Sequence, residues 1–333
     1  MTEIQSPAGA PHARILGVGG YRPSRVVTNE EICRTIDSSD EWIRTRSGIE
    51  ERRWATPDET VGVMAIGAAG KALAAAGVEA ERIGCVVIST VTHLSQTPSL
   101  AADVANQLGA VNAAAFDISA ACAGFCHGLA LAQDMIRGGS AEYVLVIGVE
   151  RLSELTDLTD RSTAFIFGDG AGAAVVGPSE TPGIGPVAWG ADGSQLEAIG
   201  QTFTWDALRD DPGLGFPFLR MAGPQVFRWA SYKMVPVALQ ALAKAGLEAG
   251  DLDAFIPHQA NNRITDAMIK ALKLPAHVPV ARDIAKTGNT SAASIPLAME
   301  RMLEEGEAPH GGAALLIGFG AGLVYAAQVV VLP

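Results

Sequence analysis

The sequence is short of cysteine and of positive charge, and it has no long apolar run. Its four cysteines show the spacing of neither a zinc site nor a disulfide framework; they are Cys33, Cys85, Cys122 and Cys126. The formal net charge of −12 argues against nucleic acid as a bulk partner. No apolar run reaches the roughly 18 residues of a membrane helix, so we expect no membrane span.

The N-terminus lacks the basic-then-apolar order of a signal peptide, because residues 1–12 are polar and contain Pro and Gly. We expect these residues to form a frayed tail, and the protein to be cytoplasmic with reduced cysteines. The rest of the chain has the composition of a folded protein, with 48% hydrophobic and 18% charged residues. Its 333 residues are enough for two compact domains or one large double unit.

Strand and helix patterns alternate along the chain, as in α/β proteins. The clearest predicted helices are 61–76, 98–108, 122–137 and 224–245, and cap-type residues Thr28 and Ser39 precede two shorter ones. The predicted strands are 14–19, 85–89, 113–118, 143–149, 164–167, 171–176, 253–256 and 315–318. We expect mostly parallel sheets with helices on both faces, and an aperiodic excursion at 202–220.

The second half of the chain repeats features of the first. Residues 72–80 align with residues 241–249 at a constant offset, and Phe167–Gly170 matches Phe319–Gly322 later in the same order. Two matches in one order indicate an internal duplication. The Pro- and Gly-rich stretch at 177–185 is the best boundary, so we expect an N-terminal half over 12–178 and a C-terminal half over 183–333.

Cys122 is the candidate nucleophile. It lies where the strand 113–118 gives way to a helix, and backbone N–H groups with the positive end of the helix dipole favour a thiolate there. The small neighbours Ala120, Ala121, Ala123 and Gly124 let a substrate approach closely. The alternative is that Cys122 is a small buried hydrophobic residue, which is the more frequent role of cysteine.

Two polar residues of the C-terminal half are candidates for the same site. His258 follows the strand 253–256, at the carboxyl end where open α/β sheets hold their chemistry, and Asn289 lies on a Gly turn before a helix. A structural hydrogen bond for His258 and a turn or cap role for Asn289 are the alternatives. The Gly-rich segment Phe319–Gly322 is suited to present a backbone N–H to a ligand.

Taken together, these motifs resemble the β-ketoacyl-acyl-carrier-protein synthase III family of thiolase-like condensing enzymes, over about residues 12 to 333. The matching segments are Ser39–Ile43 with Arg46 and Gly48, Ala121–Gly124, Asp160–Arg161, Phe167–Ala173, Met221–Gly223, Pro257–Asn261 and Gly288–Pro296. The resemblance implies a duplicated five-layer α-β-α-β-α sandwich with pseudo-twofold halves, and a homodimer. It also implies an acyltransferase that needs no metal and no other cofactor.

The resemblance implies a decarboxylative Claisen condensation. Cys122 takes the acyl group of a short-chain acyl-CoA primer as a thioester, and malonyl-acyl-carrier protein then loses CO₂. His258 and Asn289 stabilise the enolate, which attacks the thioester, while the backbone N–H groups of Cys122 and Ala321 form the oxyanion hole. Each such donor contributes about 3 kcal/mol to lowering the barrier.

By the same resemblance, further residues are expected to bind substrates and the carrier protein. The CoA contacts are Trp42 and Arg161, which clamp the adenine, together with Arg46, Gly223 and Asn261; Trp42 as a helix core residue is the alternative. The carrier protein is acidic, so docking needs a local basic face. We expect that face near His258, and its predicted members are Arg228, Gln259 and Arg263.

Two other functions remain open. One is a non-decarboxylating acyltransferase of the same fold, which would need an acid near His258 where Asn289 is expected. The other is a non-catalytic partner subunit, which the presence of Cys122, His258 and Asn289 disfavours. The sequence does not decide between acetyl, branched and longer primers, nor between fatty-acid and polyketide initiation.

Overall fold

The structure, a computed structural model, describes residue 4 and residues 8–333. Half of the tail predicted to be frayed, residues 1–3 and 5–7, therefore lies outside the described residues. The prediction is wrong for its last part, since the N–H of Ala10 donates to the carbonyl of Ile136 at 3.2 Å and His12 begins the first strand.

The first sheet has five strands in the order β1-β7-β6-β4-β5. The strands are β1 (His12–Tyr21), β7 (Asp169–Ser179), β6 (Tyr143–Arg151), β4 (Ile83–Ser89) and β5 (Ala114–Ile118). Only β6, β4 and β5 run parallel, while β1 and β7 are antiparallel to their neighbours. The prediction of a mostly parallel sheet was wrong, because only the neighbouring pairs β6–β4 and β4–β5 are parallel, whereas both pairings of β7 are antiparallel.

The second sheet has the order β11-β12-β13-β8. Its strands are β11 (Ala254–Pro257), β12 (Ala313–Gly320), β13 (Val324–Val331) and β8 (Ala188–Ala191). Only β11 and β12 are parallel. The turn between β12 and β13 is too short for a crossover, so these two strands form an antiparallel hairpin.

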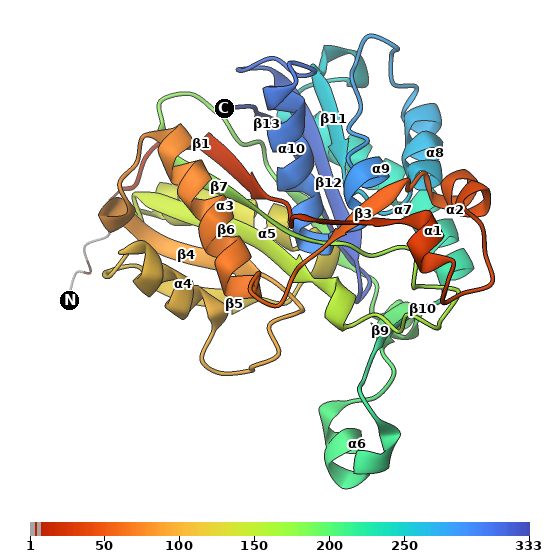
Figure 1. Ribbon diagram of the computed structural model, residues 1–333. Helices are drawn as coiled ribbons and strands as arrows, with labels where there is room; N and C mark the ends of the chain where they lie inside the picture. Colours follow the sequence, from red (N-terminus) through yellow and green to blue (C-terminus); the bar gives the residue numbers. More distant parts are fainter. Residues whose placement is uncertain (1–3, 5–7) are drawn as a thin grey trace.

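Helices divide the molecule into layers (Figure 1). Helices α5 (Gly124–Gly138) and α10 (Ser294–Glu304) lie between the two sheets and share one apolar core with both. Helices α3 (Val61–Ala76) and α4 (Leu100–Leu108) pack on the outer face of the first sheet, and α7 (Gly223–Ala245) and α8 (Asn262–Leu272) on that of the second. The five-layer architecture predicted from the resemblance is confirmed.

Capping residues in the sequence predicted the bounds of several helices correctly. Helix α3 has the predicted bounds, with Thr60 capping its start and Gly77 adopting a φ of 62° after its end. Helix α2 (Asp40–Ser47) begins after Ser39, whose Oγ accepts the N–H of Trp42 at 3.1 Å. The remaining short elements are β2 (Arg25–Thr28), α1 (Asn29–Ile32), β3 (Glu51–Trp54) and α9 (Ile284–Thr287).

The predicted strand at 164–167 was wrong. The Asp160 carboxylate accepts the N–H of Ser162 at 2.8 Å and the hydroxyl of Thr163 at 2.8 Å, which turns the chain there. Phe167 then makes a single parallel bridge to Asn289. This segment therefore connects the two halves and does not pair with β7.

The excursion predicted at 202–220 is an arm. Strands β9 (Ile199–Gln201) and β10 (Leu219–Met221) form its base, and α6 (Trp205–Asp210) lies at its tip, away from the body (Figure 1).

Among the described residues, no helix combines the length and apolar character needed to cross a membrane.

Candidate active site

Cys122 lies in a tight turn between the two halves. The turn Ala121–Ala123 connects β5 to α5, and Ala121 adopts the left-handed φ of 44°. Cys122 is half-buried and lines two cavities, one of about 980 Å³ and one of about 760 Å³. A group bound at its sulfur is therefore accessible from two directions.

The electrostatics of Cys122 differ from the sequence-based expectation. Burial raises the pKa of its thiol to about 12, the neighbouring Ser291 hydroxyl lowers it in part, and the nearby charge of Glu150 raises it. The helix start was predicted to favour the thiolate, but Cys122 precedes the first α-helical turn and is poorly solvated. The resting nucleophile is thus a thiol.

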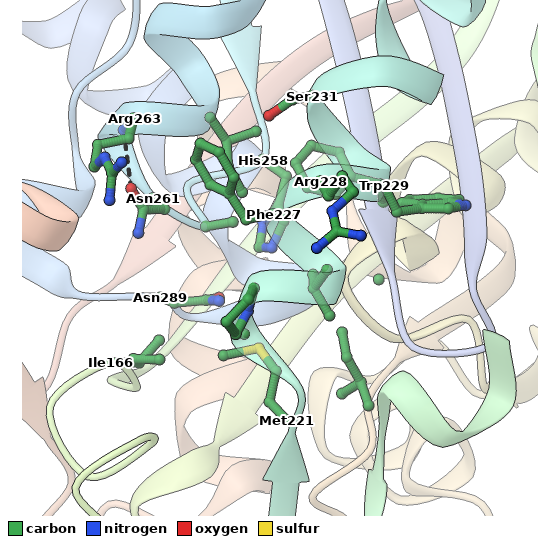
Figure 2. Close-up of a pocket in the computed structure, with 18 of the residues that line it drawn as sticks. Ile166, Met221, Phe227, Arg228, Trp229, Ser231, His258, Asn261, Arg263 and Asn289 are labelled. Carbon is green, nitrogen blue, oxygen red and sulfur yellow. Dashed lines mark hydrogen bonds between the residues drawn. The ribbon is translucent and has the colours of Figure 1, made fainter.

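His258 follows β11 and is buried, with its ring directed into the larger cavity (Figure 2). Its Nδ1 lies 2.7 Å from the Oγ of Ser294, and that Oγ accepts the N–H of Gln259 at 3.3 Å. The Ser294 hydroxyl can donate its proton to Nδ1, and in that tautomer the ring proton is on Nε2. Burial lowers the pKa of His258 to about 3, so the ring is a neutral donor.

Asn289 is held by its backbone and by one side-chain oxygen. Its N–H donates to the carbonyl of Ile166 at 2.9 Å, and its carbonyl accepts the N–H of Gly168 at 3.0 Å. The Oδ1 accepts the N–H of Ser291 at 2.8 Å, which leaves Nδ2 as the donor toward the cavity that Asn289 lines with His258 and Cys122. The structure thus brings the three predicted catalytic residues to one cavity, and Figure 2 shows His258 and Asn289 facing it from different elements.

The end of β12 approaches the nucleophile closely. A Cβ on Gly320 would lie 2.8 Å from the backbone N of Cys122 and 3.1 Å from its Sγ, so only glycine fits there. Ala321 follows and lines the smaller cavity together with Cys122. The two backbone positions predicted for the oxyanion hole are thus on adjoining turns.

Four of the five predicted CoA contacts line the larger cavity, and the fifth, Arg161, packs over one of them. Trp42, Arg46, Gly223 and Asn261 line it, and the Nδ2 of Asn261 donates to the carbonyl of Arg46 at 2.9 Å. The guanidinium of Arg161 lies 5.0 Å from the centre of the Trp42 indole. An aromatic base between the two needs about 7 Å, two van der Waals contacts, so the exposed Arg161 must move to admit one.

The three predicted docking residues differ in exposure. Arg228 and Arg263 are exposed and line the cavity entrance, and the Arg263 guanidinium lies 5.1 Å from the Phe227 ring centre. The prediction that Gln259 is a docking residue was wrong, because its side chain is buried. Its amide donates to the carbonyl of Pro257 at 2.8 Å and accepts the N–H of Ile284 at 3.1 Å.

Three residues that contact the site were missed as functional from the sequence. Ser294 fixes the His258 ring, Ser291 contacts Cys122, and the buried Glu150 accepts a hydrogen bond from Ser291 at 3.1 Å. Glu150 could have been noticed in the sequence, because it is an acidic residue directly after the apolar stretch 143–149. Within the described residues, no group of three or more His, Cys, Asp and Glu side chains is arranged to hold a metal.

Comparison with known proteins gives consistent matches along the whole chain. Residues 116–193 match the model of 3-oxoacyl-acyl-carrier-protein (ACP) synthase III, and residues 242–332 match the model of its C-terminal part. The chain is 63% identical over 343 residues to a β-ketoacyl-acyl-carrier-protein synthase III of Streptomyces coelicolor, with 100% of both chains covered.

Solved structures agree with the sequence matches. A priming β-ketosynthase of a polyketide biosynthetic pathway is 52% identical with a TM-score of 0.98, covering 100% of this chain and 99% of the other. A 3-oxoacyl-acyl-carrier-protein synthase III of Aquifex aeolicus is 41% identical with a TM-score of 0.88, covering 96% of this chain and 99% of the other.

Proposed function

The chain belongs to the 3-oxoacyl-acyl-carrier-protein synthase III family, and from that premise we propose roles for the residues of its site. It is a condensing acyltransferase that initiates chain synthesis by decarboxylative condensation, and its family uses acyl-CoA and acyl carrier protein as substrates. The observation that carries the proposal is the convergence of Cys122, His258 and Asn289 on one cavity.

In the first half-reaction Cys122 attacks the thioester carbonyl of the acyl-CoA primer, and CoA leaves. The tetrahedral oxyanion is stabilised by the backbone N–H groups of Cys122 and Ala321, on the turns that Gly320 brings into contact. Preorganised donors of this kind act without reorganisation at the moment of reaction. The product is an acyl-Cys122 thioester.

In the second half-reaction the malonyl-carrier protein loses CO₂, and two neutral donors stabilise the enolate. These are the Nε2–H of His258 and the Nδ2 of Asn289, whose other polar atoms are occupied by Ser294 and Ser291. A neutral imidazole suits this role, because a depressed pKa keeps it from binding a solvent proton near pH 7. The enolate then attacks the thioester to give the β-ketoacyl product, without a metal or other cofactor.

The larger cavity is the proposed path for the pantetheine arm, with Trp42, Arg46, Gly223 and Asn261 as contacts. Arg161 swings off the Trp42 indole to admit the adenine and then covers its outer face. Carrier-protein docking uses Arg263 and Arg228 at the same entrance. Two neighbouring cations are already paired, Arg282 with Asp266 at 2.6 Å and Lys286 with Glu50 at 2.7 Å, so they contribute less.

The assembly we propose is a homodimer in the cytoplasm. Strand β5 is an outer strand of its sheet, with the exposed Val111 just before it. An unpaired edge of this kind is suited to pair with the same edge of a second copy about a twofold axis. This places the smaller cavity, whose lining includes the loop residues His93 and Leu94, close to the partner.

The non-decarboxylating acyltransferase is disfavoured by the environment of the imidazole. That function needs an acid to hold a protonated His258, but Nδ1 contacts the hydroxyl of Ser294. The smaller cavity, of about 760 Å³, is the proposed primer pocket, and its volume accommodates branched or longer acyl groups as well as acetyl. Fatty-acid and polyketide initiation share this chemistry.

The proposal is tested by incubating the protein with radiolabelled acyl-CoA thioesters of acetyl, isobutyryl and longer chains, and then adding malonyl-carrier protein. We expect label on a Cys122 peptide, followed by labelled β-ketoacyl-carrier protein. Absence of label on Cys122 with every primer contradicts the proposal. Label without a β-keto product on adding malonyl-carrier protein supports acyl transfer to another acceptor.

A further inference from the structure

A fully buried carboxyl group, that of Glu150 near the end of β6, lies behind the nucleophile. Its Oε2 accepts the backbone N–H of Val91 at 3.1 Å and the hydroxyls of Thr92 at 2.9 Å and Thr90 at 3.3 Å. Its Oε1 accepts the hydroxyl of Ser291 at 3.1 Å. One oxygen is thus held by the segment 90–92, and the other faces the active site.

Ser291 connects this carboxylate to the sulfur. Its Oγ donates to Glu150 at 3.1 Å, and Ser291 lines the smaller cavity together with Cys122, whose thiol pKa its hydroxyl lowers. The backbone of Ser291 is fixed, with a left-handed φ of 49° and its N–H donated to the Oδ1 of Asn289. Ser291 therefore stands next to both the nucleophile and the carboxylate, and its hydroxyl is the group through which a proton can pass between them.

In the described part of the chain, no cation is paired with Glu150. Among the ion pairs of residues 8–333 none involves Glu150, and the adjacent Arg151 lies with its Nε 3.3 Å from Glu154. The titratable group facing Glu150 across Ser291 is Cys122, and His258 contacts Ser294. Burial raises the pKa of Glu150 to about 7, and its charge raises that of Cys122. Two adjacent buried anions are unfavourable, so thiolate and carboxylate exclude one another.

We propose that Glu150, acting through Ser291, takes up the thiol proton of Cys122 during acyl transfer and returns it when condensation releases the thiolate. The inference rests on the proposed role of Cys122 as acyl acceptor. Ser291 is a catalytic residue in this scheme because it contacts the reacting sulfur, and Glu150 is a positioning residue and proton store that acts through it.

The protons and electrons balance in both half-reactions. In the first, the S–H proton of Cys122 passes to Ser291 while the hydroxyl proton of Ser291 passes to Glu150. The sulfur lone pair forms the bond to the acyl carbon, the bond to the CoA sulfur breaks, and the CoA thiolate leaves to be protonated by solvent. In the second, the enolate displaces Cys122 as thiolate, which recovers its proton from Glu150 by the reverse path.

This path also explains how a thiol with a high pKa reacts near neutral pH. Transfer from Cys122 to Glu150 moves one negative charge from carboxylate to sulfur without bringing a second charge into the interior. While the acyl group is attached, both Glu150 and Cys122 are neutral. The charge reappears when the chain-extended product leaves.

The test compares the wild-type protein with Glu150→Gln, Ser291→Ala and the double variant. The measured quantity is the rate of label transfer from acyl-CoA to Cys122, by rapid quench between about pH 5.5 and 9.5. We expect the wild-type rate to rise with an inflection near pH 7 and then level off, as Glu150 ionises. Each variant should lose that inflection and be about 100-fold slower near pH 7.5, within the range of general acid–base effects.

The double variant should be no slower than the slower single variant, because the two residues act as one unit. Asp169→Asn is the matched control, since burial raises the pKa of Asp169 to about 6 and its carboxylate contacts Ser153 and Ala55. It should keep the inflection near pH 7.

An unchanged inflection in Glu150→Gln, or its loss in Asp169→Asn as well, would overturn the inference. Additive losses in the double variant would do the same. If Glu150→Gln does not fold, Ser291→Ala decides alone, because it retains the carboxyl group. Failure of the proposed function can be told apart from failure of this inference, because in that case the wild-type protein itself takes no label on Cys122.

Discussion

The two halves build the same turn and use it differently. In the N-terminal half the turn Ala121–Ala123 leads into α5, and in the C-terminal half the turn Ser291–Ala293 leads into α10. The first residue of each turn is left-handed, with φ of 44° and 49°. The residue after it is Cys122 in one half and Ala292 in the other.

What differs is where that second residue faces. Cys122 lines both cavities, whereas Ala292 is buried, and a Cβ on Gly148 would lie 2.2 Å from its carbonyl oxygen. The C-terminal turn instead contributes its flanking polar groups, Asn289, Ser291 and Ser294, to the site of the other half. The same left-handed turn thus holds the nucleophile in one half and polar partners of the site in the other.

The largest effect is expected from exchanging Cys122 and Ala292 between the two turns. Cys122→Ala should abolish acyl loading and lower turnover by about 10⁴-fold or more, since a nucleophile has no substitute. Cys122→Ala combined with Ala292→Cys should recover nothing, because position 292 faces Gly148 and neither cavity. Labelling by acyl-CoA and turnover with malonyl-carrier protein provide the measurements, and recovered label in the double variant would contradict the assignment.

A smaller loss of activity is expected from a substitution at Gly320, where the end of β12 contacts the turn of Cys122. Gly320→Ala should displace the backbone of Cys122, because the added Cβ would lie 2.8 Å from its N, and a shift of this size lowers kcat/KM about 100-fold. Gly70→Ala is the control, since Gly70 is exposed within α3 with nothing within 4 Å of the added Cβ. It should keep full activity and raise the free energy of unfolding by about 1 kcal/mol. Equal activity of the two variants would refute the close contact.

The smallest effect concerns the basic entrance of the C-terminal half. Arg263→Glu should raise the KM for malonyl-carrier protein about fivefold to tenfold and weaken its salt dependence, while sparing loading from acyl-CoA. Arg137→Glu, at the exposed end of α5 in the N-terminal half, is the matched charge reversal and should change neither. Equal loss in both half-reactions of Arg263→Glu would rule out a docking role.

The sequence was sufficient wherever the signal was local. Thr60 and Gly77 marked both ends of α3, and a strand end followed by small residues marked the turn at Cys122. Periodicity failed at 164–167, because the hydrogen bonds that Asp160 accepts from Ser162 and Thr163 turn the chain despite its apolar pattern. Strand direction was also not predictable, since it depends on pairing between distant segments.

The electrostatics of the site were the least predictable part, because they depend on burial from several elements at once. The helix start alone favours a thiolate at Cys122, yet its surroundings raise the pKa of the thiol. Glu150 is 28 residues from Cys122 and 141 from Ser291, so no local spacing connects them. Gln259 stands within a polar run that looks exposed in sequence, but its amide is buried.

The nucleophile Cys122 and the donors His258 and Asn289 serve different steps, so the two half-reactions are measured separately. His258→Ala should load label from acyl-CoA onto Cys122 at nearly the wild-type rate, and Asn289→Ala should lose loading only as far as Ser291 loses the backbone hydrogen bond to Asn289 Oδ1. Condensation with malonyl-carrier protein should fall by about 10²–10³-fold in each, the effect of removing one oxyanion donor. Loading that falls as far as condensation in either variant would contradict the account.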